Sequence, residues 1–182
     1  MTAAVILGAG SGRRMGGPKA LLNLGGETLL HRAARLALAA GCVPVVAVVG
    51  DWEPGLGDLE VLLAVNPEAA EGMASSIRVG IAALPAEVQA TLLLTVDQPE
   101  VDSGLLEHLL ALAALAPERP AACAYEGTLG IPAVLPRSLF PALLALRGDR
   151  GAKGILLAAA TATLPFPGGA EDLDTPEDLL RR

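Results

Sequence analysis

Short apolar runs alternate along this chain with segments in which apolar residues recur at helical spacing. Four runs are dominated by Ala, Val, Leu and Ile: residues 3–7, 43–49, 60–65 and 91–96. Runs of this length are typical of strands that a parallel sheet buries on both faces. At residues 28–40 the apolar side chains share one helical face, which predicts a helix capped by Thr28. A further helix is predicted over 104–116.

Beyond Pro117 the pattern changes to shorter elements. Strands are predicted at 121–125 and 130–135, and a helix at 138–146. Thr175 and Pro176 have the residue types of a helix N-cap and first position, which predicts a last helix. The order of elements predicts one α/β domain over residues 1–182, with three α/β/α layers and a mostly parallel, Rossmann-like sheet of about six or seven strands.

Composition excludes several classes of partner. A net charge of −7 and 2% aromatic residues argue against nucleic-acid binding, which favours a basic face and stacking rings. No apolar run reaches the roughly 18 residues needed to span a bilayer, so no membrane partner is expected. Cys42 and Cys123 fit neither a disulfide framework nor a CxxC metal site, and both lie in apolar runs that predict core positions. A cytoplasmic protein is the default expectation, since the N-terminus lacks the basic region of a signal peptide.

The first apolar run ends in a loop that holds five glycines before Lys19. Glycines let backbone N–H groups converge on an anion, and Arg13, Arg14 and Lys19 add positive charge. The loop is therefore predicted to hold a polyphosphate at the carboxyl end of the first strand. The residues predicted to contact a nucleotide here are Leu7, Gly8, Ala9, Gly10, Ser11, Gly12, Arg14 and Lys19.

Two common phosphate-binding loops do not fit this stretch. The dinucleotide fingerprint G-x-G-x-x-G begins with Gly8 and Gly10, but its last glycine position holds Arg13. The P-loop pattern G-x-x-x-x-G-K-[ST] fails because Pro18 separates Gly17 from Lys19 and Ala20 replaces the magnesium-binding hydroxyl.

The fourth apolar run delivers Asp97 to the carboxyl edge of the predicted sheet. A carboxylate directly after a buried strand is costly unless a cation meets it. Mg²⁺ bridging the phosphates is the natural partner, because it takes one or two carboxylates together with substrate oxygens. A serine-capped helix start near Ser75 is expected to turn free N–H groups and hydroxyls toward the same edge. Arg150 and Lys153 lie among glycines near another helix start and predict a second anion site.

Five ordered segments resemble the nucleotidyltransferases that build nucleotide-linked molybdenum cofactors. The first loop is similar to their pattern L-A-A-G-x-S-x-R-M-G-x-P-K, with Gly8 and Gly12 standing where that pattern has Ala and Ser. The other four segments are similar to N-P-x(n)-G-M-x-S-S-[LI]-R-x-G, the Asp-Gln-Pro turn, L-x-G-D-x-G-A-[RK]-x-[IL]-L and D-[IL]-D-T-P-E-D-L.

The resemblance implies a nucleotide-diphospho-sugar transferase type of fold and roles for further residues. Those implied beside the nucleotide are Asn66, Gly72, Ser75 and Ser76; those implied on the acceptor side are Gln98, Pro99, Arg150 and Lys153. Asp174 is implied as a second metal carboxylate beside Asp97. Arg14, Lys19 and Asp97 are the expected catalytic residues, with Mg²⁺ as the cofactor.

The implied reaction transfers CMP from CTP to the phosphate of molybdopterin or molybdenum cofactor and releases pyrophosphate. Gly8-Ala9-Gly10 is close to the cytidylyl pattern A-A-G, whereas guanylyltransferases have A-G-G. Met-Gly-Gly-Pro-Lys also lacks the extra residue and the Asp that precede the lysine in guanylyltransferases. The alternatives are a guanylyltransferase that uses GTP, a sugar-phosphate or alcohol-phosphate nucleotidyltransferase, and a molybdenum cofactor carrier without chemistry. A molybdenum hydroxylase is a further implied partner, as recipient of the product.

Overall fold

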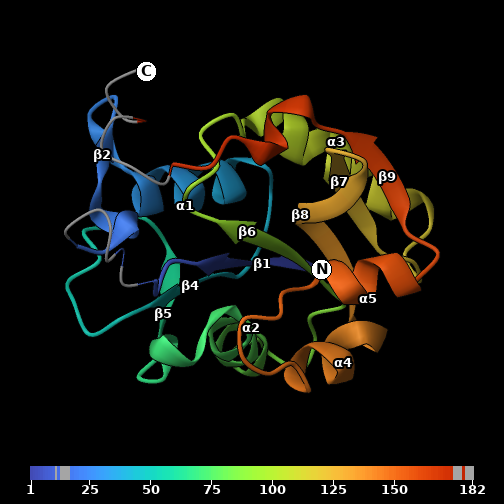
Figure 1. Cartoon of the computed structure of the whole chain (residues 1–182), viewed down its shortest axis with the longest axis horizontal. Coiled ribbons are helices and arrows are strands. Elements are labelled where there is room, and N and C mark those ends of the chain that lie inside the picture. The colour runs from blue at the N-terminus through green and yellow to red at the C-terminus, as the bar shows by residue number, and fades with distance from the viewer. Residues whose placement is uncertain (11, 13–16, 174–177, 179–182) are drawn as a thin grey trace.

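The computed structural model describes residues 1–10, 12, 17–173 and 178. In this part of the chain, seven strands form one sheet in the order β5-β4-β1-β6-β8-β7-β9 (Figure 1). The strands are β1 (Thr2–Leu7), β4 (Val45–Val49), β5 (Val61–Val65), β6 (Ala90–Thr95), β7 (Ala121–Tyr125), β8 (Thr128–Pro136) and β9 (Ala162–Pro165). Among these seven strands β8 alone runs against the rest, because it pairs antiparallel with both β6 and β7. The predicted mostly parallel sheet is thereby confirmed.

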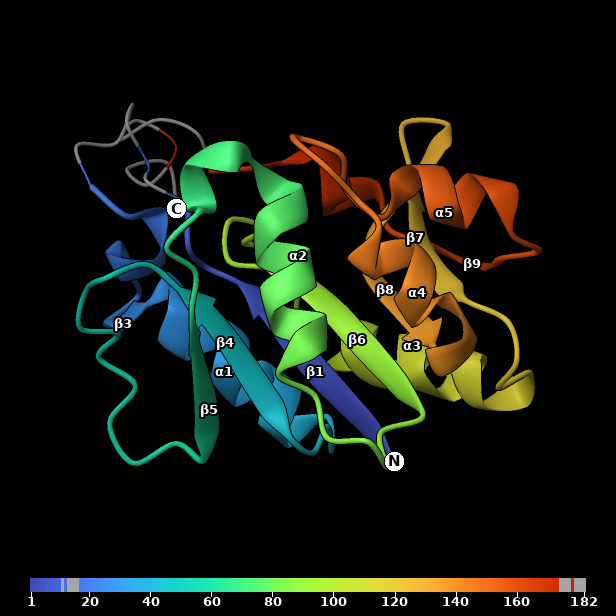
Figure 2. The ribbon, with the colours of Figure 1, turned by 90° about the horizontal axis from the view of Figure 1, so that it is seen from below.

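Helices cover both faces of the sheet. They are α1 (Leu29–Ala39), α2 (Met73–Ala82), α3 (Ser103–Leu115), α4 (Phe140–Leu144) and α5 (Lys153–Ala158). A small hairpin of β2 (Asn23–Leu24) and β3 (Glu27–Thr28) precedes α1, and short 3-10 turns occur at Lys19–Leu21, Ala69–Glu71, Arg137–Leu139 and Pro167–Ala170. Helices α1 and α3 lie on one face, and α2, α4 and α5 lie on the other (Figures 1 and 2).

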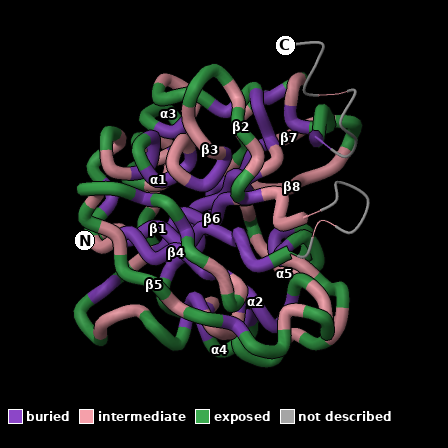
Figure 3. The backbone as a smooth tube through the Cα atoms, turned by 90° about the vertical axis from the view of Figure 1, so that its left-hand side faces the viewer, coloured by how far each residue is buried: buried purple, intermediate pink, exposed green. Residues whose placement is uncertain are grey.

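The central strands show why their sequences are apolar without alternation. In β1, Ala4 and Ile6 pack into the core under α1 and α3, whereas Ala3, Val5 and Leu7 pack against α2, α4 and α5. Successive side chains of a strand point to opposite faces, so a strand covered on both faces must be apolar throughout. Figure 3 shows this buried centre with the exposed segments around it.

Most predicted elements within the described residues are confirmed to within about two residues, the ordinary uncertainty of element boundaries. The last helix, predicted to begin at Thr175, lies outside the described residues. The N-cap is confirmed as well, because the side chain of Thr28 accepts a hydrogen bond from His31 N. The helix expected at 138–146 is wrong in extent: a 3-10 turn at Arg137–Leu139 leads into α4, which ends at Leu144. Strand β9 was not expected from the sequence, because a run of four partly exposed residues is too short to show the alternation typical of a strand.

The topology brings several loops to one edge of the sheet. The parallel strands β1, β4, β5 and β6 all end there, and the loops that begin at Gly8, Gly50, Asn66 and Val96 follow them. The C-terminal segment reaches the same edge, since Leu173 N donates to Asp97 O at 2.9 Å. Among the helices of the described residues, none is long and apolar enough to cross a membrane.

Helix α2 lies so close to the sheet that Gly80 leaves no room for a side chain. A Cβ there would overlap Val5 Cγ1 and lie 3.0 Å from Val48 Cγ2. We therefore expect Gly80→Ala to lower the free energy of unfolding by about 1–3 kcal/mol through overpacking, despite alanine's better helix propensity. Urea denaturation measures the change.

Gly104 in α3 provides the matched control. A Cβ at Gly104 would meet only Asp102 Oδ1, at an ordinary 3.5 Å. Gly104→Ala should therefore leave the stability unchanged or raise it by up to about 0.5 kcal/mol. Equal effects of the two substitutions would contradict the close packing of α2 on β1 and β4.

Candidate functional site

An ion pair joins the loops that follow β1 and β6. Lys19 Nζ lies 3.2 Å from Asp97 Oδ2, and the two side chains are 21% and 22% exposed. Lys19 begins a 3-10 turn anchored by the fully buried Ala20, while Asp97 follows β6 by two residues. The chain thus places an ammonium and a carboxylate, 78 residues apart, side by side at the carboxyl edge of the central strands.

The glycine loop, residues 8–19, departs from the family pattern at two positions, and its backbone explains both. A Cβ at Gly8 would lie 3.1 Å from Val48 O and 3.3 Å from Leu30 Cδ1, so the loop leaves β1 with little space for a side chain. Gly12 has φ +52°, and a Cβ there would overlap Gly17 O and lie 2.9 Å from Lys19 N. Glycine tolerates this left-handed backbone, which brings the two ends of the loop together.

Gln98 holds three segments at the edge of the sheet. Its Nε2 donates to Ile131 O at 3.1 Å in β8 and to Gly169 O at 2.9 Å, and its Oε1 lies 3.3 Å from Thr95 Oγ1. The side chain is 5% exposed and both amide protons are directed at backbone carbonyls. Gln98 therefore ties the end of β6 to β8 and to the 3-10 turn at Pro167–Ala170, next to Asp97 and on the side that the resemblance assigns to the acceptor.

Arg32 in α1 binds the backbone shortly after Asp97, and sequence reasoning assigned this arginine no role. Its Nη2 donates to Pro99 O at 2.8 Å and to Val101 O at 2.6 Å. Burial lowers the pKa of Arg32 from its usual value, although a guanidinium stays protonated in proteins. A short turn after a buried strand leaves backbone carbonyls that need donors, which is the one signal that could have suggested such a partner.

The residues implied beside the nucleotide form a buried hydrogen-bond network. Asn66 Nδ2 donates to Ser75 Oγ at 2.9 Å and to Ser76 Oγ at 3.0 Å, and Asn66 Oδ1 accepts from Glu68 N at 3.0 Å. The three side chains are between 1% and 7% exposed. They fix the start of α2 to the end of β5.

At this helix start the expected serine cap is wrong, and two of the N–H groups expected to be free are already hydrogen-bonded. Gly72, with φ +123°, occupies the N-cap, and Ser75 Oγ donates to Gly72 O at 2.8 Å instead of accepting from an amide. Ala74 N donates to Gly148 O at 3.0 Å and Ser75 N to Gly72 O at 3.3 Å. These two orphan donors of the first turn are therefore already used inside the protein.

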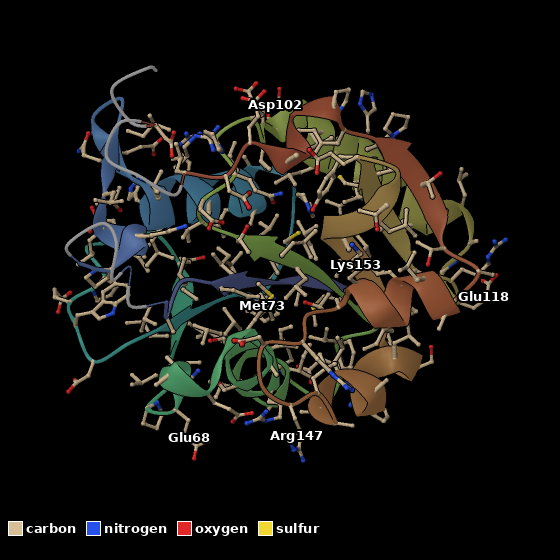
Figure 4. The ribbon with its side chains drawn as sticks, in the orientation of Figure 1. Glu68, Met73, Asp102, Glu118, Arg147 and Lys153 are labelled. Atoms are coloured by element: carbon tan, nitrogen blue, oxygen red, sulfur yellow. The ribbon has the colours of Figure 1, made fainter. Side chains whose placement is uncertain are left out.

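The segment 146–153 lies against the start of α2. A Cβ at Gly72 would overlap Asp149 Oδ1 and lie 2.7 Å from Gly148 O, and a Cβ at Gly151 would lie 2.9 Å from Met73 Sδ. Arg150 and Lys153 are exposed, and within the described part of the chain neither forms an ion pair. Figure 4 shows Lys153 at the start of α5 and Met73 at the start of α2.

Three predicted site residues lie outside the described residues: Ser11, Arg14 and Asp174. The sequence neighbour of Asp174, Leu173, is hydrogen-bonded to the backbone of Asp97. Within the described residues there is no cluster of three or more His, Cys, Asp or Glu side chains suited to a metal. Asp97 offers a carboxylate at this edge that fits Mg²⁺, which needs only one or two protein carboxylates when a polyphosphate completes its ligands.

Neither cysteine belongs to this chemistry. Cys42 and Cys123 are free and buried, as the sequence predicts, and burial raises both thiol pKa values to about 12. A thiol that stays protonated is neither a nucleophile nor a metal ligand at neutral pH. The described part of the site therefore offers charge and hydrogen-bond donors rather than a covalent nucleophile.

Comparison with known proteins finds a matching family model and several curated relatives. Residues 4–163 match the model of the MobA-like NTP transferase domain. The chain is 31% identical over 197 residues to the purine catabolism protein PucB of Bacillus subtilis (strain 168), covering 98% of this chain and 95% of that protein. It is 33% identical over 194 residues to the nicotine blue oxidoreductase of Paenarthrobacter nicotinovorans (97% and 94% covered). It is 36% identical over 188 residues to the molybdenum cofactor guanylyltransferase of Rhodobacter capsulatus (98% and 93%).

The solved structures agree in fold. Rv0371c from Mycobacterium tuberculosis H37Rv has a TM-score of 0.83 to this chain at 25% identity, covering 99% of this chain and 96% of that one. Its complex with manganese has a TM-score of 0.76 at 24% identity, with the same coverage. The predicted nucleotide-diphospho-sugar transferase type of fold is confirmed.

Proposed function

The chain belongs to the MobA-like NTP transferase family, and from this membership we propose that it transfers CMP from CTP to the phosphate of molybdopterin or molybdenum cofactor. The pterin phosphate oxygen attacks the α-phosphorus, the bond from that phosphorus to the β-phosphate bridging oxygen breaks, and pyrophosphate leaves with the electron pair. Such a reaction depends on positioning and charge neutralisation more than on covalent help from the protein.

The observation that carries the proposal is the Lys19–Asp97 pair at the carboxyl edge of β1 and β6. An ammonium next to a glycine loop suits the β- and γ-phosphates, where the charge of the leaving pyrophosphate develops. Arg14 lies in the same loop in sequence and is proposed to share this task. Gly8 N donates to Val48 O at 2.9 Å, so the backbone N–H groups of residues 9–12 are proposed to hold the triphosphate. Asn66, Gly72, Ser75 and Ser76 are proposed to shape the base side.

Asp97 is proposed to hold the metal, together with Asp174, which follows Leu173 in the sequence. When bound, Mg²⁺ would neutralise charge on the α-phosphate oxygens and orient the triphosphate. A carboxylate that already faces a cation, the Lys19 ammonium at 3.2 Å, fits that use. On the acceptor side, the exposed Arg150 and Lys153 are proposed to bind the pterin phosphate.

The first loop favours CTP, since Gly8-Ala9-Gly10 lacks the A-G-G of the guanylyl pattern and Lys19 follows Met-Gly-Gly-Pro without an intervening Asp. One comparison favours GTP instead: a relative with 36% identity over nearly its whole length is a molybdenum cofactor guanylyltransferase. A guanylyltransferase is therefore the second candidate, with the same fold, metal site and reaction.

The test is Mg²⁺-dependent pyrophosphate release with molybdopterin, or its molybdenum form, and each of CTP, GTP, ATP and UTP. We expect release with CTP at a kcat/KM at least ~100-fold above that with GTP, a discrimination of about 2.7 kcal/mol. A preference for GTP would replace the cytidylyl assignment by the guanylyl one. Absence of release with all four nucleotides would contradict nucleotidyl transfer to this acceptor, and omission of the metal serves as the internal control.

A further inference from the structure

Glu71, at the end of the 3-10 turn before α2, and Arg78, within α2, form a bridge to the segment 146–150. Neither residue has a role in the chemistry proposed above. Arg78 Nη1 and Nη2 donate to Glu71 Oε1 and Oε2 at 2.9 and 2.6 Å, a bidentate pair. Arg78 Nη1 also donates to Leu146 O at 2.9 Å, and Gly148 N donates to Glu71 Oε1 at 3.1 Å. We call these two side chains the clasp.

The clasp reaches a segment that has few other attachments. Within the described chain, the hydrogen bonds that tie backbone groups of 146–150 to another segment come from Glu71, Arg78 and Ala74 N, which donates to Gly148 O at 3.0 Å. The start of α2 is held separately, since Asn66 bonds Ser75 and Ser76 from the end of β5. Loss of the clasp would therefore leave only the bond from Ala74 N among these described hydrogen bonds to the 146–150 segment, while α2 keeps its own support.

Charge and backbone geometry suit this fixed arrangement. Hydrogen bonds from Arg78 and from Gly148 N lower the pKa of Glu71 to about 2, so the carboxylate stays ionised at neutral pH. Gly72 permits the close approach, because any Cβ at that position would overlap Asp149. Bidentate guanidinium–carboxylate pairs fix orientation as well as distance, which an ammonium does not.

We propose that Glu71 and Arg78 are positioning residues that hold the 146–150 segment, and with it Arg150 and Lys153, in the geometry that binds the acceptor phosphate. This inference rests on the proposed function for the identity of the acceptor. Neither clasp side chain touches a substrate; each acts through the segment that it holds. A small displacement of groups that orient a reactant lowers the efficiency of the reaction, so residues that hold those groups in place affect catalysis without touching the substrate.

The experiment compares Arg78→Gln, Arg78→Lys and Glu71→Gln with the wild type in two readouts. The first is amide hydrogen exchange at Gly148 and Ala74, which needs no substrate. The second is the kinetics of pyrophosphate release, with the acceptor and the nucleotide varied separately. We expect faster exchange at both amides, an acceptor KM raised ~10-fold, and a nucleotide KM changed less than about twofold. Arg78→Lys should resemble Arg78→Gln, because charge without the planar fork cannot span Glu71 and Leu146 O.

Two substitutions are matched controls. Arg35→Gln breaks an equivalent bidentate pair, with Glu27, on the opposite face of the sheet. Glu68→Gln removes a carboxylate that lies 4.0 Å from Arg78 but is 74% exposed and projects outward (Figure 4). Both should leave exchange at Gly148 and the acceptor KM within about twofold of the wild type.

The outcomes separate this inference from the proposed function. Unchanged exchange at Gly148 in the clasp variants overturns the clasp, and so does a parallel rise of both KM values or a fall in kcat alone. No pyrophosphate release from the wild type overturns the proposed function instead; exchange at Gly148 then still decides whether the clasp holds the segment.

Discussion

Asp97→Asn is expected to lower kcat for pyrophosphate release by at least ~10²–10³-fold, the usual cost of removing one charge-stabilising group from a transition state. The neutral amide keeps the shape of the carboxylate but loses the charge that would hold Mg²⁺ and that faces Lys19 at 3.2 Å. Because both side chains are about one-fifth exposed, losing the ion pair should cost at most about 1 kcal/mol of stability. Steady-state kinetics at saturating Mg²⁺ and urea denaturation measure the two effects.

Asp102→Asn is the matched control for this substitution. Asp102 lies five residues further along and caps α3, where its Oδ1 accepts from Leu105 N at 2.8 Å. Asparagine is an equally good N-cap, so both turnover and stability should stay near wild-type values. A near-normal rate in Asp97→Asn would remove the metal-binding role of Asp97, and a matching loss in Asp102→Asn would show that the loop, not the carboxylate, was disturbed.

The fold was largely predictable because the sequence pattern that indicates it, short apolar runs separated by amphipathic segments, is local and recurs along the chain. Each central strand is covered on both faces, so its composition alone distinguishes it from the amphipathic helices between strands. The position of the site follows from the same fact, since parallel strands bring the loops after Leu7, Val65 and Thr95 to one edge. Asp97 is recognisable in the sequence because a carboxylate that ends an apolar run needs a cation nearby.

The contacts that support the site were not predictable, because they join segments distant in sequence. Arg32 reaches Pro99 O across 67 residues, and Gly148 O occupies the N–H of Ala74, which sequence reasoning left free for a ligand. Backbone carbonyls are present at every residue, so no residue type marks the one that a helix start or an arginine will bond. The sequence also predicted a cation beside Asp97, but it did not indicate that Lys19 would lie there. Only the folded loop brings Lys19 and Asp97 together.

Lys19→Ala is expected to raise the dissociation constant for CTP by about 10- to 100-fold, which corresponds to the roughly 1.5–3 kcal/mol of a hydrogen bond to a charged group. The lysine begins the 3-10 turn at the end of the glycine loop, so its ammonium lies next to the loop that is proposed to hold the triphosphate. Calorimetric titration with CTP and Mg²⁺ in the absence of acceptor measures binding without turnover. Unchanged CTP affinity would contradict the assignment of this loop to the triphosphate.

Lys153→Ala is the matched control, because Lys153 is the other lysine of the chain and is assigned to the acceptor. It should leave CTP affinity within about twofold and raise the acceptor KM. Combining Lys19→Ala with Asp97→Asn adds a sharper condition: groups in contact are not additive, so the double variant should bind CTP better than the sum of the single losses predicts. Strict additivity would mean that Lys19 and Asp97 act on the nucleotide independently, despite the 3.2 Å that separates them.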